Sequence, residues 1–190
     1  IRWGLTGTIP KEKFEFESIH ASLGPVIGEI TAKELQDKGV LAQCHVNIVQ
    51  LLDTQVHSNY QEELKYLVTN QDRIEYLGKL LNTVRESGNT LILVDRISAG
   101  EQLQTLIPNS TFVKGDVKLK DRKNAYDEIN EGTNHVVIAT YGVAAVGINI
   151  PRIFNLVLIE PGKSFVRVIQ SIGRGVRKAK DKDFVQIWDL

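Results

Sequence analysis

Residues 164–177 read SFVRVIQSIGRGVR, and this stretch decides how the rest of the chain is interpreted. At ~100° per residue, a helix here gathers its apolar side chains on one broad side: Phe165, Val168, Ile169, Ile172 and Val176. The opposite side carries polar and basic side chains at spacings of i, i+3, i+7 and i+10: Arg167, Gln170, Arg174 and Arg177. The pattern predicts a helix with one buried face and one cationic face.

The cationic face favours an anion as its ligand. Arginine stays charged, and its planar guanidinium matches the oxygens of a phosphate group. Like charges on neighbouring turns repel one another unless an anion lies among them, although a solvated basic face is the alternative interpretation. Gly173 and Gly175 each cost a helix roughly 1 kcal/mol relative to alanine, which indicates a close approach to the backbone there.

Outward from this helix, apolar runs alternate with helical patterns. We expect strands at 90–94, 111–114, 135–139, 154–159 and 184–189, with helices at 98–106 and 120–131. The run Thr90–Val94 is typical of a strand covered on both faces. The alternation predicts an α/β fold, in which a parallel sheet has helices on both faces and the carboxyl ends of its strands share one edge. We expect the candidate residues, the arginine row included, to lie at that edge.

The first ninety residues carry less regular signals. Expected strands span 3–10, 26–30 and 46–53, and expected helices span 11–24, 58–68 and 72–86. Thr31 and Glu34 have the spacing of a capping box, which predicts a short helix that ends at Gly39. Trp3 and Trp188 are interpreted as packing residues.

Composition limits the classes of protein that remain. The chain has 190 residues, and its 23 basic and 23 acidic side chains give a net charge of zero, so phosphate binding must come from local placement. A single cysteine, Cys44, excludes an internal disulfide and fits a reducing cytoplasm. The four histidines lack metal-ligand spacing, and no apolar run could span a bilayer, so we expect neither a metal site nor a membrane partner. The absence of methionine leads us to expect that the chain lies inside a longer protein.

The pattern Gln170-x-x-Gly173-Arg174-x-x-Arg177 resembles motif VI of superfamily 2 helicases and translocases. Upstream segments resemble the companion motifs in the family's order: Thr6-Gly7-Thr8 motif III, Leu91–Gly100 motif IV, and Val136–Pro151 motif V. The resemblance implies a RecA-like C-terminal lobe over residues 11–190, a P-loop NTPase-type fold without its own P-loop, and it makes residues 1–10 the end of a preceding lobe. Within the family, the chain looks most similar to phage UvsW-type and restriction-helicase-like enzymes.

The resemblance also implies roles for individual residues. Arg174 and Arg177 would be the arginine fingers that reach the γ-phosphate of ATP. Residues near the nucleotide would be Gln170, Gly147, Asn149 and Gly173, although Asn149 stands where the family has Asp and Val146 where many members have Arg. Contacts to a nucleic-acid backbone would come from Thr140, Gly115, Arg96 and Ser98, and Thr6 and Thr8 would couple the two lobes. The alternatives are a surface charge for Arg96 and for Arg122, and a helix N-cap for Ser98.

ATP with Mg²⁺ would be bound mainly by the missing N-terminal lobe. Gly162-Lys163-Ser164 imitates a P-loop, but Val157 occupies the position of the required first glycine. Asp127-Glu128 imitates a Walker B pair, but it lies in the middle of an expected helix rather than at a strand end.

The sequence therefore predicts one lobe of an ATP-dependent helicase that is inactive alone. The expected partners are the preceding lobe and DNA, including branched DNA, with RNA or an RNA–DNA hybrid as the other possibility, in the cytoplasm of a bacterium or a phage-infected cell. A non-catalytic nucleic-acid-binding or adaptor module is one alternative, and a nucleotide-binding regulatory or metabolic domain is another.

Overall fold

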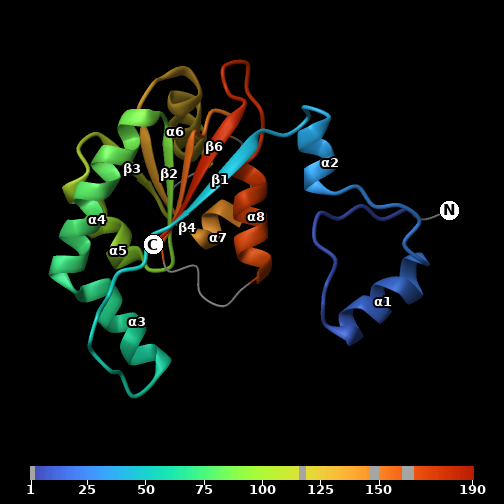
Figure 1. Ribbon diagram of the computed structural model, residues 1–190, viewed down its shortest axis with the longest axis horizontal. Coiled ribbons are helices and arrows are strands. Elements are labelled where there is room, and N and C mark those ends of the chain that lie inside the picture. Colours follow the sequence, from blue (N-terminus) through green and yellow to red (C-terminus); the bar gives the residue numbers. More distant parts are fainter. Residues whose placement is uncertain (1–2, 116–118, 146–149, 160–164) are drawn as a thin grey trace.

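A single parallel sheet forms the centre of the chain, in a computed structural model that describes residues 3–115, 119–145, 150–159 and 165–190 (Figure 1). Its strand order is β1-β6-β5-β2-β4-β3, and all five neighbouring pairs are parallel. The strands are β1 Gln43–Ile48, β2 Thr90–Val94, β3 Ser110–Val113, β4 Val136–Thr140, β5 Asn155–Leu158 and β6 Phe184–Asp189. The predicted α/β fold with a RecA-like parallel sheet is confirmed.

Helices cover both faces of this sheet. In chain order they are α1 Lys13–Leu23, α2 Ala32–Asp37, α3 Tyr60–Thr69, α4 Gln71–Val84, α5 Ile97–Leu106, α6 Leu119–Glu131, α7 Tyr141–Ala145 and α8 Phe165–Gly175, with a short 3₁₀ helix η1 at Arg85–Ser87. The helices α4 and α5 pack on one face of the sheet, where they contribute Leu77, Leu81 and Leu103 to one core cluster. The helices α6, α7 and α8 pack on the other face, around a second cluster.

The strands supply both clusters because successive side chains point to opposite faces. In β2, Leu91 and Leu93 belong to the cluster beneath α6, α7 and α8, whereas Ile92 and Val94 belong to the cluster beneath α4 and α5. All five residues of β2 are buried, as the apolar run predicts. The strand β2 thus lies between β5 and β4 and packs against the helices on both faces of the sheet.

Some expected elements are absent or displaced. Residues 3–10 and 26–30 form no strand, because they lack a neighbouring strand to pair with, and Ile27 in the second segment is 76% exposed. The strand expected at 46–53 begins earlier, at Gln43, and ends at Ile48, the residue paired with the last residue of β6. The motif V segment, expected to be a loop, contains the short helix α7. The helix after residue 58 is capped by Asn59, whose side chain accepts a hydrogen bond from the Glu62 amide.

The chain before β1 packs little against the rest. Figure 1 shows α1 and α2 lying apart from the sheet, and neither helix has a buried residue. The predicted capping box is confirmed: the Glu34 amide donates to Thr31 Oγ1 at 3.2 Å, and the Thr31 amide donates to Glu34 Oε2 at 2.7 Å. The expectation that Trp3 packs is wrong, because its side chain is 75% exposed, whereas Trp188 packs against the core.

None of the helices in the described ranges combines the length and the apolar character that a membrane span requires. No group of three or more His, Cys, Asp or Glu side chains in the same part of the chain could hold a metal ion.

Candidate functional site

Helix α8 packs as its sequence pattern predicts, with one exception. Val168 and Ile172 lie against the core cluster beneath α6, α7 and α8, and Val176 is buried just after the helix ends. Ile169, which was expected on the buried side, remains 36% exposed. The apolar stripe is therefore narrower than predicted, and a larger part of the helix faces away from the sheet.

The two candidate arginine fingers lie at the end of this helix. Arg174 lies in the last turn of α8, and Arg177 lies two residues beyond the end of the helix. Both side chains are half-buried. Partial burial lowers the pKa of the Arg174 guanidinium, the like charge of Arg177 lowers it further, and Tyr126 on α6 opposes this shift. An arginine still remains protonated at physiological pH. Two neighbouring cations in a partly desolvated position form a place where a bound anion would be stabilised.

The neighbouring candidates Gln170 and Gly173 are both exposed on α8. A Cβ atom built on Gly173 would meet nothing within 4 Å, so this part of the chain gives no packing reason for a glycine there. At Gly175, in contrast, a Cβ would lie 3.1 Å from Leu156 Cδ2 in β5. The predicted close approach to the backbone is therefore found inside the chain at Gly175, and at Gly173 it would have to come from another molecule or domain.

Several predictions fall on residues outside the described ranges. They concern Gly147 and Asn149 as nucleotide contacts, Val146 as a departure from the family pattern, and Gly162-Lys163-Ser164 as a false P-loop. Thr6 and Thr8 are described, and their hydrogen bonds form a local turn: the Thr8 amide donates to Thr6 Oγ1 at 3.1 Å, and the Thr6 hydroxyl donates to the Thr8 carbonyl at 3.0 Å. Asp127 and Glu128 lie within α6, as expected.

The candidate nucleic-acid contacts lie at the carboxyl edge of the sheet. Thr140 is the last residue of β4, and Gly115 follows two residues after β3. Arg96 and Ser98 follow β2, and both side chains are exposed. Arg96 Nε lies 3.6 Å from a carboxylate oxygen of Asp95. The alternative of Ser98 as a helix cap is wrong, because α5 begins at Ile97 with Arg96 in the cap position.

The arginine pair lies elsewhere, beside the amino-terminal half of the strands. Gly175 faces Leu156, the second residue of β5, and the Val176 carbonyl accepts a hydrogen bond from the Ala42 amide just before β1. Figure 1 shows the reason: α8 starts below the carboxyl edge of the sheet and runs back along the strands. The expectation that all candidate residues share the carboxyl edge is therefore wrong for Arg174 and Arg177.

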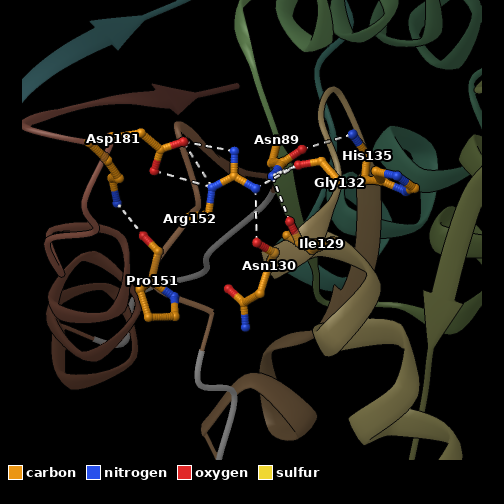
Figure 2. A network of polar contacts seen from close by, with 9 residues as sticks. Asn89, Ile129, Asn130, Gly132, His135, Pro151, Arg152 and Asp181 are labelled. Atoms are coloured by element: carbon orange, nitrogen blue, oxygen red, sulfur yellow. Dashed lines mark hydrogen bonds and ion pairs between the residues drawn. The ribbon is translucent and has the colours of Figure 1, made fainter.

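A cluster of polar contacts around the Arg177 backbone, some buried and some exposed, was not predicted (Figure 2). Arg152 donates from Nε and Nη2 to Asp181, at 2.7–3.2 Å, and from Nη1 to the carbonyls of Asn130 and Gly132, both at 2.8 Å. This contact lowers the pKa of the Asp181 carboxyl group. The ammonium group of Lys182 donates to three carbonyls, those of Gly175 at 2.5 Å, Arg177 at 2.9 Å and Pro151 at 3.1 Å.

Nothing in the sequence distinguishes these residues beforehand. Lys182 follows Lys178 and Lys180 in a charged segment and reads as one more surface lysine, yet its side chain is 1% exposed. Burial lowers its pKa to about 8. The carbonyls that Lys182 contacts come from backbone positions that no side-chain pattern can identify.

Comparison with known proteins identifies the family. The family model described as helicase conserved C-terminal domain matches residues 72–179, which is more than half of the chain. The ATP-dependent DNA helicase uvsW of Enterobacteria phage T4 is 26% identical over 200 residues, covering 100% of this chain and 40% of that protein. The putative DNA 3'-5' helicase Rad25 of Haloarcula marismortui is 27% identical over 192 residues, covering 97% of this chain and 30% of that protein.

Solved structures agree on the fold. The crystal structure of T4 UvsW superposes with a TM-score of 0.64 at 24% identity, covering 79% of this chain and 33% of that one. A fragment of a putative HsdR subunit of a type I restriction enzyme from Vibrio vulnificus gives a TM-score of 0.74 at 16% identity, covering 95% of this chain and 38% of that one. This chain thus spans less than half the length of these relatives.

Proposed function

The chain belongs to the helicase conserved C-terminal domain family, as the C-terminal RecA-like lobe of a superfamily 2 helicase, and from this premise we propose that Arg174 and Arg177 complete an ATP site. ATP with Mg²⁺ would be held mainly by a second, N-terminal RecA-like lobe of the same protein. The two arginines would approach the γ-phosphate when the lobes close.

The placement of charge on α8 is the observation that carries this proposal. Arg174 and Arg177 are both half-buried, and the charge of Arg177 helps to lower the pKa of the Arg174 guanidinium. Gln170 and Gly173 are exposed on the same helix, and Gly173 leaves open space beside the backbone. A phosphate chain brought to this surface would relieve the repulsion between the guanidinium groups and could approach the helix closely.

The chemistry follows from charge. A phosphoryl group in transfer spreads negative charge over its equatorial oxygens, and positioned arginines stabilise that charge more in the transition state than in bound ATP. Gln170 would help to orient the arginines. Since the arginines act only when the two lobes are closed, hydrolysis would be coupled to opening and closing of the protein.

The carboxyl edge would form the second functional surface. The candidate groups there are the exposed Arg96 and Ser98 after β2, the exposed Gly115, and the half-buried Thr140 at the end of β4. Such groups suit phosphate oxygens of a nucleic-acid backbone and carry no base specificity. We propose DNA as the substrate because the uvsW and Rad25 relatives are named DNA helicases. Branched DNA, an RNA–DNA hybrid, and a role in repair or recombination are narrower forms of the same proposal.

The test uses a protein that joins this chain to its nucleotide-binding lobe. Arg174→Ala and Arg177→Ala should each lower kcat for ATP about a hundredfold or more, with DNA binding changed by less than about twofold. Arg96→Ala is the matched control and should instead weaken DNA binding and reduce its salt dependence. Near-normal kcat in both Arg174→Ala and Arg177→Ala would reject the proposal. Tight DNA binding by this chain alone, unaffected by nucleotide, would favour the adaptor function.

A further inference from the structure

Lys182 is a buried cation, and its three hydrogen bonds all go to backbone carbonyls. Its three carbonyl acceptors belong to Gly175, Arg177 and Pro151. The desolvation of an ammonium group is costly unless its hydrogen-bond donors are satisfied, and here three donors meet three acceptors. Because burying an ammonium group next to the candidate site is costly, we ask what Lys182 contributes besides packing.

Two of the three acceptors lie in the segment that carries the candidate arginines. The carbonyls of the last turn of a helix have no partner within the helix, so an external donor there determines how the chain leaves the helix. Gly175 follows Arg174 directly, and Arg177 supplies its own carbonyl to the Lys182 ammonium group. The backbone on the carboxyl side of each arginine is thereby bound to one atom, Lys182 Nζ.

The third acceptor connects this helix end to a different segment. Pro151 is the last residue of the segment that resembles motif V and Arg152 follows it, whereas Asp181 and Lys182 follow α8. Figure 2 shows Asp181 paired with Arg152, and the neighbouring Lys182 contacts the Pro151 carbonyl, so two adjacent residues bind two adjacent residues. Arg152 continues the connection to the carbonyls of Asn130 and Gly132 at the end of α6. One polar cluster therefore joins the ends of α6, the motif V segment and α8.

We propose that Lys182 is a positioning residue that holds Arg174 and Arg177 in the geometry required for ATP hydrolysis and ties them to the motif V segment. This inference rests on the proposed function, because it assigns the arginines to the ATP site. Lys182 would touch neither ATP nor nucleic acid. Its substitution should therefore affect the chemical step more than the binding of either.

The experiment compares Lys182→Met with Lys180→Met in the protein that carries both lobes. Methionine keeps the length of the buried side chain and removes its donors, whereas Lys180 is exposed in the same connection and serves as the matched control. For Lys182→Met we expect kcat to fall about tenfold or more, with KM for ATP and the Kd for DNA changed by less than about twofold. Lys180→Met should retain the kcat of the unmodified protein.

A combined variant separates positioning from a general structural effect. If Lys182 acts through the two arginines, adding Lys182→Met to a variant that carries both Arg174→Ala and Arg177→Ala should cause no further loss of kcat, whereas independent effects would multiply. Normal kcat in folded Lys182→Met, or a multiplied loss in the combined variant, would overturn the inference. Normal kcat in Arg174→Ala itself would instead refute the proposed function.

Asp181→Asn provides the second arm if Lys182→Met does not fold. The Asp181 side chain is about half exposed, so its amide replacement removes the charge that pairs with Arg152 at little risk to the core. Loss of that pair should lower kcat about twofold or more, and the loss should again vanish when both Arg174 and Arg177 are replaced by alanine. Unchanged kcat in Asp181→Asn would count against the inference.

Discussion

Substituting the two glycines of α8 by alanine should have opposite effects on stability. The two positions are two residues apart in one helix, so differences in sequence context are small. At Gly173 a new Cβ would meet nothing within 4 Å. At Gly175 it would lie 3.1 Å from Leu156 Cδ2 and 3.4 Å from Leu156 Cβ. Leu156 is completely buried in the core and has little room to move.

The magnitudes follow from these contacts. Alanine in a helix interior is favoured over glycine by roughly 1 kcal/mol, so Gly173→Ala should raise the free energy of unfolding by about that amount. At Gly175 the same gain is opposed by an overpacking cost of about 1–3 kcal/mol, so the net change should run from near zero to a loss of about 2 kcal/mol. The two variants should therefore differ by about 1–3 kcal/mol, with Gly173→Ala the more stable.

Urea denaturation of the 190-residue chain, followed by circular dichroism, measures both changes directly. In a domain of this size, 1 kcal/mol corresponds to about 2–4 °C in Tm, so thermal melting is an independent check. The reasoning is refuted if Gly173→Ala lowers the free energy of unfolding, or if Gly175→Ala raises it as much as Gly173→Ala does. When the nucleotide-binding lobe is attached, Gly173→Ala should lower kcat despite its greater stability, because the added methyl group would occupy the open space beside α8.

Two further predictions concern buried polar groups. Asn89→Ala should cost about 2–4 kcal/mol in urea denaturation, because the Asn89 side chain donates to the Ile129 carbonyl and accepts from the His135 amide, and both groups would lose this partner. The Gly132 carbonyl, which also accepts from Asn89, would keep its hydrogen bond from Arg152. A loss below about 1 kcal/mol would contradict the prediction. The pKa of Lys182 is lowered from 10.5 to about 8, so the unfolded chain holds its proton more tightly and the fold becomes more stable as pH rises between these values. Relative to Lys182→Met, the free energy of unfolding should rise by up to about 3 kcal/mol over that pH window, and a constant difference would contradict the prediction.

The sequence predicted the sheet better than it predicted the site. Strands such as β2 are apolar on both faces, so pattern alone locates them to within a residue or two. The segment 26–30 was also predicted as a strand but has no neighbouring strand, and sequence cannot show whether a pairing partner is present. Ser98 has the chemistry of a helix cap but lies one residue inside α5. Lys182 could not be identified at all, because its role depends on three carbonyls brought together by the fold.

The separation of the two candidate surfaces follows from the fold itself. A helix that follows a parallel strand begins at the carboxyl edge and runs back, and the 11 residues of α8 cover ~16 Å in that direction. Residues at the carboxyl ends of strands, such as Thr140, therefore lie at one edge of the sheet, whereas Arg174 lies beside the amino-terminal half of the strands. Any influence of DNA on ATP hydrolysis within this lobe must cross that distance. The chain that leaves β4 and α7 continues to Pro151, whose carbonyl Lys182 binds together with those of Gly175 and Arg177, so a shift of the motif V segment has a direct polar route to the arginines.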